Sequence, residues 1–167
     1  MKPTLGVLLI LSALAALTPT SAGRADISCK NFEATILLRA TEEGCTSPVH
    51  LCTTGTVESS DPSLAGATWF FTALATAEAA GLPTSLPLTV LSYAGSVVVT
   101  TPRDGTFTTS NAGVYDTDAG AFSQLDRITS GTGKFTDAKD RLIFTTATGG
   151  GEAGFQSHVR GELCLNQ

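Results

Sequence analysis

The chain has 167 residues, of which 42% are hydrophobic, and a formal net charge of −5 at pH 7. Nucleic acids and anionic membranes are poor partners for this acidic balance, because both carry negative charge themselves. The length suits one ordinary domain with a proper core, and the sequence contains no internal repeats that would indicate a repeat array.

Residues 1–25 predict a cleavable signal peptide. Lys2 precedes an apolar run over 5–17, and small residues follow at Ala22 and Ala25. This is the layout of a secretory leader. The apolar run is too short to cross a bilayer, which takes about 20 residues. Cleavage after Ala22 or Ala25 stays open. We expect a secreted or periplasmic protein, not inserted in a membrane after cleavage, whose single domain covers 26–167.

Four cysteines indicate two disulfides. Their number is even, and thiols of an exported chain tend to pair. Cys45 and Cys52 bracket a short turn, whereas Cys29 and Cys164 lie near the two ends of the mature chain. We therefore expect the pairs Cys45–Cys52 and Cys29–Cys164, with four free buried thiols as the alternative.

The mature chain predicts eight β-strands. Short runs rich in β-branched and aromatic residues recur between Gly, Pro and Asp turn signals, which is typical of an all-β sandwich or barrel. The expected strands lie near 32–40, 50–58, 67–76, 88–101, 105–115, 120–130, 141–148 and 154–164. The clearest hairpin turns are 102–105, 116–120 and 149–151.

One segment, 73–80, is ambiguous because alanine favours helices and the following Gly81 could cap one. The preceding residues 68–72 (Thr-Trp-Phe-Phe-Thr) are strongly strand-like. We therefore expect 73–80 to be the end of a strand that leads into a loop.

The even strand count predicts how the sheet closes. In an eight-stranded antiparallel up-and-down β-barrel, the last strand runs antiparallel beside the first, and no sheet edge is left exposed. The end of the last strand then lies beside the start of the first. Cys29 and Cys164 would meet there.

Three stretches in the second half of the chain resemble a known family. They are 113–116 (Gly-Val-Tyr-Asp), 120–126 (Gly-Ala-Phe-Ser-Gln-Leu-Asp) and 130–138 (Ser-Gly-Thr-Gly-Lys-Phe-Thr-Asp-Ala). The chain resembles a bacterial-type, secreted member of the allene oxide cyclase barrel-like family, which is related to the plant dirigent proteins. The resemblance covers 105–164 well and is looser before that, where only 52–56 and 81–83 are similar.

The resemblance implies an eight-stranded antiparallel barrel with an apolar cavity. In the plant relatives this cavity holds a reactive lipid epoxide or phenoxy radicals, and the cyclases place a carboxylate on an early strand. Here the acidic residue of the first strand, Glu33, falls on its outward face. From the residues themselves, Gly131 and Gly133 can take positive φ in a tight connection, and Phe135 can fold back on the barrel end.

Three glycine- or aspartate-rich motifs lack the context that a cofactor needs. Residues 149–154 match a dinucleotide fingerprint, but the segment after them alternates like a strand. Residues 131–134 have the wrong spacing for a phosphate loop, and in 116–120 a glycine replaces a calcium ligand. His50, beside Cys52, has no further ligands nearby, and His158 falls on the outward face of the last strand. We expect no cofactor and no metal.

The alternation of each strand predicts which residues enter the barrel. The inward faces should carry Phe32, Ala34, Ile36, Leu38, Trp69, Phe71, Leu91, Tyr93, Val97, Val99, Phe107, Asn111, Tyr115, Phe122, Gln124, Asp126 and Ile128. We expect Asp126 to find a donor there, such as Tyr93, Tyr115 or Asn111, or to have its pKa raised by desolvation.

An apolar lumen with a few polar groups is typical of a small-molecule site. Its ligand-binding candidates are Trp69, Tyr93, Asn111, Tyr115, Gln124 and Asp126. The sequence thus favours non-covalent binding of a small apolar molecule in the lumen. Two alternatives stay open: a cofactor-independent cyclase or isomerase that acts by positioning its substrate, and a surface interaction protein with a filled barrel. Self-association stays open as well.

Overall fold

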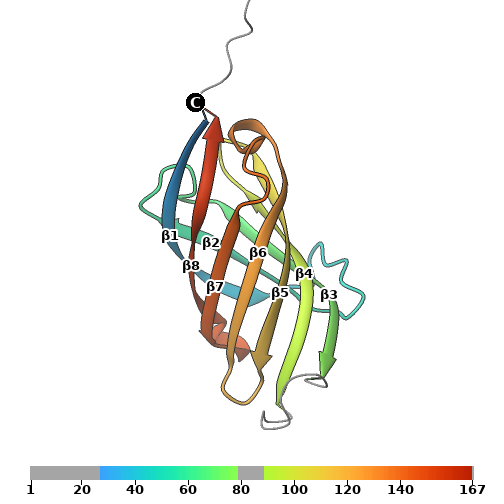
Figure 1. Ribbon diagram of the computed structural model, residues 1–167. Coiled ribbons are helices and arrows are strands. Elements are labelled where there is room, and N and C mark those ends of the chain that lie inside the picture. The colour runs from blue at the N-terminus through green and yellow to red at the C-terminus, as the bar shows by residue number, and fades with distance from the viewer. Residues whose placement is uncertain (1–26, 79–88, 167) are drawn as a thin grey trace, which may run out of the picture.

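The computed structural model describes residues 27–78 and 89–166. They form a closed barrel of eight antiparallel strands in which each strand pairs with its neighbours in sequence (Figure 1). The strands are β1 (Ile27–Ala40), β2 (Cys52–Ser59), β3 (Thr68–Glu78), β4 (Val90–Thr100), β5 (Thr106–Asp116), β6 (Ala121–Gly131), β7 (Leu142–Gly149) and β8 (Phe155–Asn166). The predicted fold class is confirmed. None of the helical turns in the described part of the chain is long and apolar enough to cross a membrane.

The ambiguous alanine-rich segment belongs to a strand. β3 continues through Glu78, and a register shift between Ala73 and Ala75 marks a bulge in its pairing with β4. The strand ending predicted there is confirmed as far as Glu78. The expected leader at 1–25 and the loop at 81–83 lie outside the described residues.

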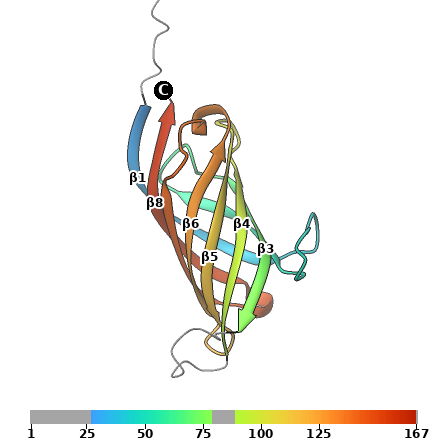
Figure 2. The same cartoon turned by 45° about the vertical axis from the view of Figure 1, so that its right-hand side comes forward.

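The barrel closes between β1 and β8, which lie side by side in Figures 1 and 2. The two strands pair from Ile27 with Asn166 to Leu38 with Phe155, and Cys29 stands directly opposite Cys164. The two cysteines form the expected disulfide across the seam of the barrel. The strand count and the cysteine placement are therefore mutually consistent.

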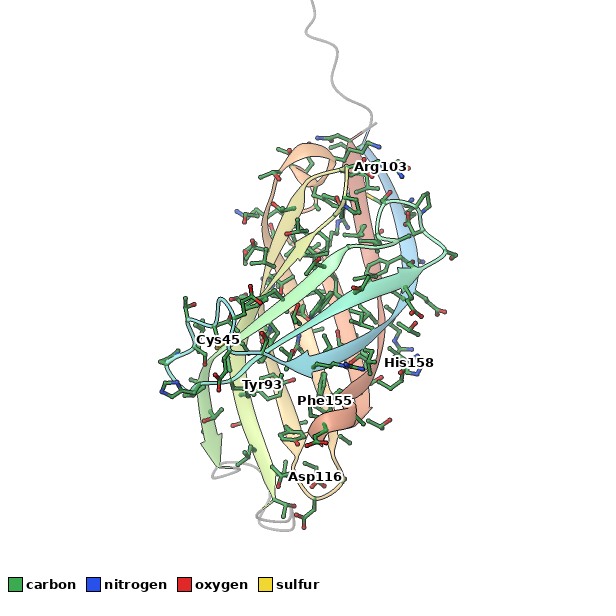
Figure 3. All side chains as sticks on the ribbon, turned by 180° about the vertical axis from the view of Figure 1, so that it is seen from behind. Cys45, Tyr93, Arg103, Asp116, Phe155 and His158 are labelled. Carbon is green, nitrogen blue, oxygen red and sulfur yellow. A yellow bond between two sulfur atoms is a disulfide. The ribbon has the colours of Figure 1, made fainter. Side chains whose placement is uncertain are left out.

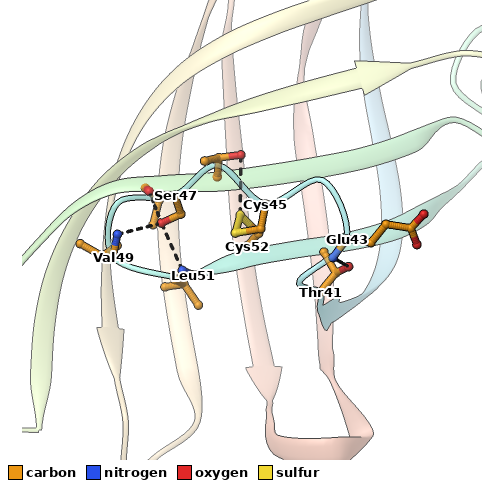
Figure 4. Close-up of a disulfide and its surroundings, with 9 residues drawn as sticks. Thr41, Glu43, Cys45, Ser47, Val49, Leu51 and Cys52 are labelled. Atoms are coloured by element: carbon orange, nitrogen blue, oxygen red, sulfur yellow. Dashed lines mark hydrogen bonds between the residues drawn. A yellow bond between two sulfur atoms is a disulfide. The ribbon is translucent and has the colours of Figure 1, made fainter.

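The second disulfide, Cys45–Cys52, constrains the loop between β1 and β2. This loop projects from the side of the barrel beside β3 in Figure 2. The Ser47 hydroxyl donates to the Ala73 carbonyl at 2.6 Å and accepts the amides of Val49 and Leu51 at 3.2 and 3.1 Å (Figure 4). The loop is thus anchored to β3 as well as closed on itself. All four cysteines are paired, which is typical of an oxidising, extracellular or periplasmic compartment.

Aromatic side chains fill the end of the barrel where β1 begins and β8 ends. A short 3-10 turn, η1 (Gly133–Phe135), follows β6 and buries Phe135, whose ring lies 5.1 Å from that of Phe107. Gly133 has φ of +59°, as predicted. The prediction of a positive φ at Gly131 is wrong, because this residue ends β6. A glycine is needed there for another reason: a Cβ would collide with the Phe135 carbonyl.

Candidate functional site

The inward face predicted from strand alternation is the buried face of the barrel. Most of the predicted lumen residues are buried, from Phe32 and Ile36 on β1 to Asp126 and Ile128 on β6. Leu91, Tyr93, Tyr115 and Phe122 are only half-buried. These four belong to the end of the barrel where β3 and β5 finish and β4 and β6 begin. The interior is therefore less tightly covered at that end.

A pocket of about 70 Å³ opens at this less covered end. Figure 3 shows Tyr93 and Phe155 in this half of the molecule, toward Asp116 and away from Arg103. All eight strands and the disulfide loop contribute to its lining: Leu38, Leu51, Thr53, Trp69, Phe71, Tyr93, Tyr115, Phe122, Gln124, Thr145 and Phe155. The pocket is a feature of the closed barrel, because no single hairpin could form it.

Aromatic rings make up one continuous wall of the pocket. The ring centroids of Phe71 and Tyr93 are 5.7 Å apart, those of Tyr93 and Phe122 6.5 Å, and those of Phe122 and Phe155 5.4 Å. Tyr115 contacts Phe155 at 5.7 Å, and all four pairs meet edge to face. Such pairs hold each other in place, so the wall is preorganised rather than loosely packed.

A hydrogen-bonded polar cluster lies at the inner end of the pocket. The Tyr93 hydroxyl donates to Gln124 Oε1 at 3.0 Å, and Gln124 Nε2 donates to Asp126 Oδ2 at 2.8 Å. Asp126 Oδ1 accepts from the Thr109 hydroxyl at 2.7 Å and from Asn111 Nδ2 at 3.2 Å. The donor that the sequence required for Asp126 is thus supplied three times over, and Asn111 is among the predicted partners.

Burial controls the acidity of this cluster. Asp126 is fully buried, and desolvation raises the pKa of its carboxyl although the hydrogen bonds from Gln124, Thr109 and Asn111 lower it. Desolvation, with a contribution from the nearby Asp126 carboxylate, raises the pKa of the Tyr93 hydroxyl above its usual range. Tyr93 therefore acts as a neutral hydrogen-bond donor to Gln124.

One fully buried polar atom of a residue in the pocket lining has no protein partner. The side chain of Thr145 on β7 is 1% exposed, lines the pocket, and has a hydroxyl without a hydrogen bond. The Asn111 Oδ1 and Ser157 Oγ atoms are also buried and unpartnered. Buried polar atoms are normally satisfied, so an unpartnered hydroxyl on an otherwise apolar pocket wall indicates a place where a bound molecule can supply the missing partner.

The structure separates the six predicted ligand-binding residues into two groups. Trp69, Tyr93, Tyr115 and Gln124 line the pocket, whereas Asn111 and Asp126 are buried outside its lining, and Gln124 bonds to Asp126. Sequence reasoning missed Thr145, because the alternation was not followed along β7. The buried positions Ile143, Thr145 and Ala147 would have placed it inward by the same rule.

The motifs that the sequence assigned to the surface or to turns lie there. Glu33 and His158 are exposed on the outside of the barrel. Asp116 Oδ1 accepts the amides of Asp118 and Ala119, so its carboxylate stabilises the turn itself. Residues 149–154 form a connection into strand β8 rather than into a helix. Among the residues the structure describes, no group of three or more His, Cys, Asp or Glu side chains could hold a metal.

Comparisons with family models, with curated proteins and with solved structures found no match to this chain.

Proposed function

We propose that the protein is an exported barrel that binds a small apolar molecule non-covalently in the lumen pocket, with one polar atom of the ligand paired to the Thr145 hydroxyl. The unpartnered, 1% exposed Thr145 side chain in an aromatic pocket carries this proposal. An apolar wall with a few placed polar groups is the usual composition of a small-molecule site. The hydroxyl fixes where the polar atom of the ligand lies.

The size of the pocket limits the ligand. An apolar cavity of about 150 Å³ holds one benzene molecule, and this pocket measures about 70 Å³. The pocket is too small for a whole benzene ring, so part of a ring or the end of a short chain enters it, and the rest of the molecule lies at the mouth beside the exposed Leu51. A long chain such as a fatty acid does not fit inside, because Phe107 and Phe135 fill the far end of the barrel.

Binding is favoured over the cyclase alternative by the position of the carboxylate. A catalytic acid or base must reach the reacting atom at hydrogen-bond distance, and Asp126 does not belong to the pocket lining. Its two oxygens are already engaged by Thr109, Asn111 and Gln124. We propose that the chain shares the barrel architecture of the allene oxide cyclase barrel-like family. The proposal does not include the chemistry of that family.

The test compares two ligands of similar shape, benzyl alcohol and toluene, by isothermal titration calorimetry. Replacing Thr145 by Val keeps the shape of the side chain and removes the hydroxyl. We expect Thr145→Val to weaken benzyl alcohol by about 0.5–1.5 kcal/mol, the net worth of a neutral hydrogen bond, and to leave toluene unchanged.

The matched control is Thr146→Val, the same substitution one residue further along β7 at a position outside the pocket lining. It should change neither affinity. If neither ligand binds the wild-type protein, the binding proposal is wrong and the interaction protein with a filled barrel takes its place. If Thr145→Val weakens both ligands equally, the Thr145 hydroxyl does not contact the ligand.

A further inference from the structure

The pocket has a carboxyl group beside its lining and, among the described residues, no basic side chain in that lining. Lys, Arg and His are all absent from the described residues of the lining, and the buried carboxyl of Asp126 lies one hydrogen bond behind Gln124. A bound carboxylate would therefore have no cation to neutralise it and would lie near a like charge. The chain as a whole is acidic, with a net charge of −5, which also opposes the approach of anions.

Several atoms of the pocket lining can accept a hydrogen bond from a ligand. The hydroxyl hydrogen of Tyr93 is used by Gln124, which leaves the Tyr93 oxygen free to accept. Gln124 Oε1 and the unpartnered Thr145 hydroxyl can accept as well. A ligand that brings donors thus finds several partners within the lining.

The remaining surface of the pocket consists largely of π-systems. Trp69, Phe71, Tyr93, Tyr115, Phe122 and Phe155 all line it. Cations are attracted to aromatic rings by the ring quadrupole, and this attraction is stronger where the cation is shielded from water. All of these rings except Trp69 are held edge to face, so they need little reorganisation to receive a ligand.

We infer that the pocket selects an organic cation, an alkyl- or arylammonium, over neutral and anionic molecules of the same shape. This inference rests on the proposed function and names the chemical class of its ligand. The ammonium group donates to the acceptors of the polar cluster, the aromatic wall surrounds its alkyl or aryl part, and the Asp126 carboxylate provides the nearest opposite charge.

Three probes of matched shape test the selectivity: benzylammonium, benzyl alcohol and benzoate, each titrated into the full-length protein by calorimetry at neutral pH. We expect benzylammonium to bind about tenfold more tightly than benzyl alcohol, in line with a shielded cation–π contact plus a nearby carboxylate. Benzoate should show no measurable binding. Equal affinities for benzylammonium and benzyl alcohol, or tighter binding of benzoate, would overturn the inference.

The role of Asp126 is tested by pH on the wild-type protein, which avoids a variant that fails to fold. Benzylammonium stays fully charged as the pH falls from neutral, whereas Asp126 becomes protonated as the pH falls through its raised pKa. The affinity of the protein for benzylammonium should therefore decrease toward acid pH, while its affinity for benzyl alcohol stays constant. The side chains that surround Asp126 without titrating are Thr109, Asn111, Gln124, Ile143 and Thr145. The titratable phenols in the pocket lining are Tyr93 and Tyr115, and the raised pKa of Tyr93 keeps its hydroxyl neutral at acid pH.

One further group needs a control, because the titratable side chain of His50 is exposed next to Leu51 at the rim. Its φ of +55° is tolerated by asparagine, so His50→Asn removes the titratable group without straining the loop. The pH dependence should persist in His50→Asn. If the pH dependence of binding disappears in His50→Asn, it arises from His50, and the proposed role of Asp126 is wrong.

Toluene separates the two levels of the argument. If toluene and benzyl alcohol bind but benzylammonium shows no preference, the cation inference fails and the proposed binding function stands. If none of the probes binds, both fail.

Discussion

Two lumen threonines, Thr109 and Thr145, are equally buried and differ in their partners. Each is 1% exposed. The Thr109 hydroxyl donates to Asp126 at 2.7 Å, whereas the buried hydroxyl of Thr145, a residue of the pocket lining, has no partner. The Thr109 hydroxyl therefore stabilises the barrel. The Thr145 hydroxyl lowers the stability of the barrel, and a bound ligand would supply its missing contact. This pair therefore shows, at single residues, where folding and binding make different demands.

Replacing each of these threonines by Val separates the two demands. Thr109→Val should lower the free energy of unfolding by about 1–3 kcal/mol, because it removes a donor from a buried carboxyl. Thr145→Val should leave it unchanged or raise it by up to about 1 kcal/mol, because it removes a buried hydroxyl without a bond. Urea denaturation followed by circular dichroism measures both. Equal losses in the two variants would mean that Thr145 has a partner of its own in the folded protein.

At the scale of elements, the two disulfides hold different parts of the barrel. Cys29–Cys164 joins β1 to β8 across the seam and links residues 135 apart in sequence. Cys45–Cys52 closes a loop of sequence separation 7, which Ser47 anchors to β3 and from which Leu51 reaches the pocket rim. The first therefore secures the closure of the whole sheet, and the second positions one side of the pocket mouth.

Removing each disulfide by a pair of Ser substitutions should have unequal effects. In the chain-entropy model the seam disulfide stabilises the fold by roughly 5 kcal/mol and the loop disulfide by roughly 2.5 kcal/mol, because loop-closure entropy grows with the length of chain enclosed. Thermal or chemical unfolding of the two double variants gives the comparison. A larger loss from the Cys45–Cys52 variant would show that contacts of the loop, rather than chain entropy, dominate its contribution.

The strands were predictable from the sequence because one face of each is buried. In β1 the alternation from Phe32 to Leu38 fixes the inward side, and it is the buried side in the structure. The turns at 102–105 and 116–120 follow from Gly and Asp in the same way. The seam disulfide followed from the even strand number. These features depend on local sequence and on parity, both of which a single chain displays.

The pocket was only partly predictable, because it depends on distances across the barrel. The alternation placed Trp69, Tyr93, Tyr115 and Gln124 inward, but the volume left between them is set by how Phe107 and Phe135 fill the far end. Side-chain geometry decides whether the amide nitrogen or the amide oxygen of Gln124 faces Asp126, and it decides which hydroxyl is left without a partner. The register shift between Thr108 and Thr109 has no signal in the sequence that we can identify.

At the scale of the whole molecule, the two ends of the barrel differ in kind. One end holds the seam disulfide and the buried Phe135, and it is closed by its own side chains. The other end holds the half-buried aromatic rings and the pocket. A barrel that was only a scaffold for surface contacts would gain stability from filling both ends. The open end with its unpartnered hydroxyl is the reason that the account centres on binding.

The most direct measurement of that central claim uses Trp69, the only tryptophan of the chain, which lies in the pocket lining. A ligand in the pocket must therefore alter the intrinsic tryptophan fluorescence, and titration with benzyl alcohol should give a saturable change. Thr53→Leu, which adds volume to the same lining, should abolish this change while circular dichroism confirms that the barrel is still folded. A fluorescence signal that stays flat, or that changes equally in the wild-type protein and in folded Thr53→Leu, would contradict binding in the lumen.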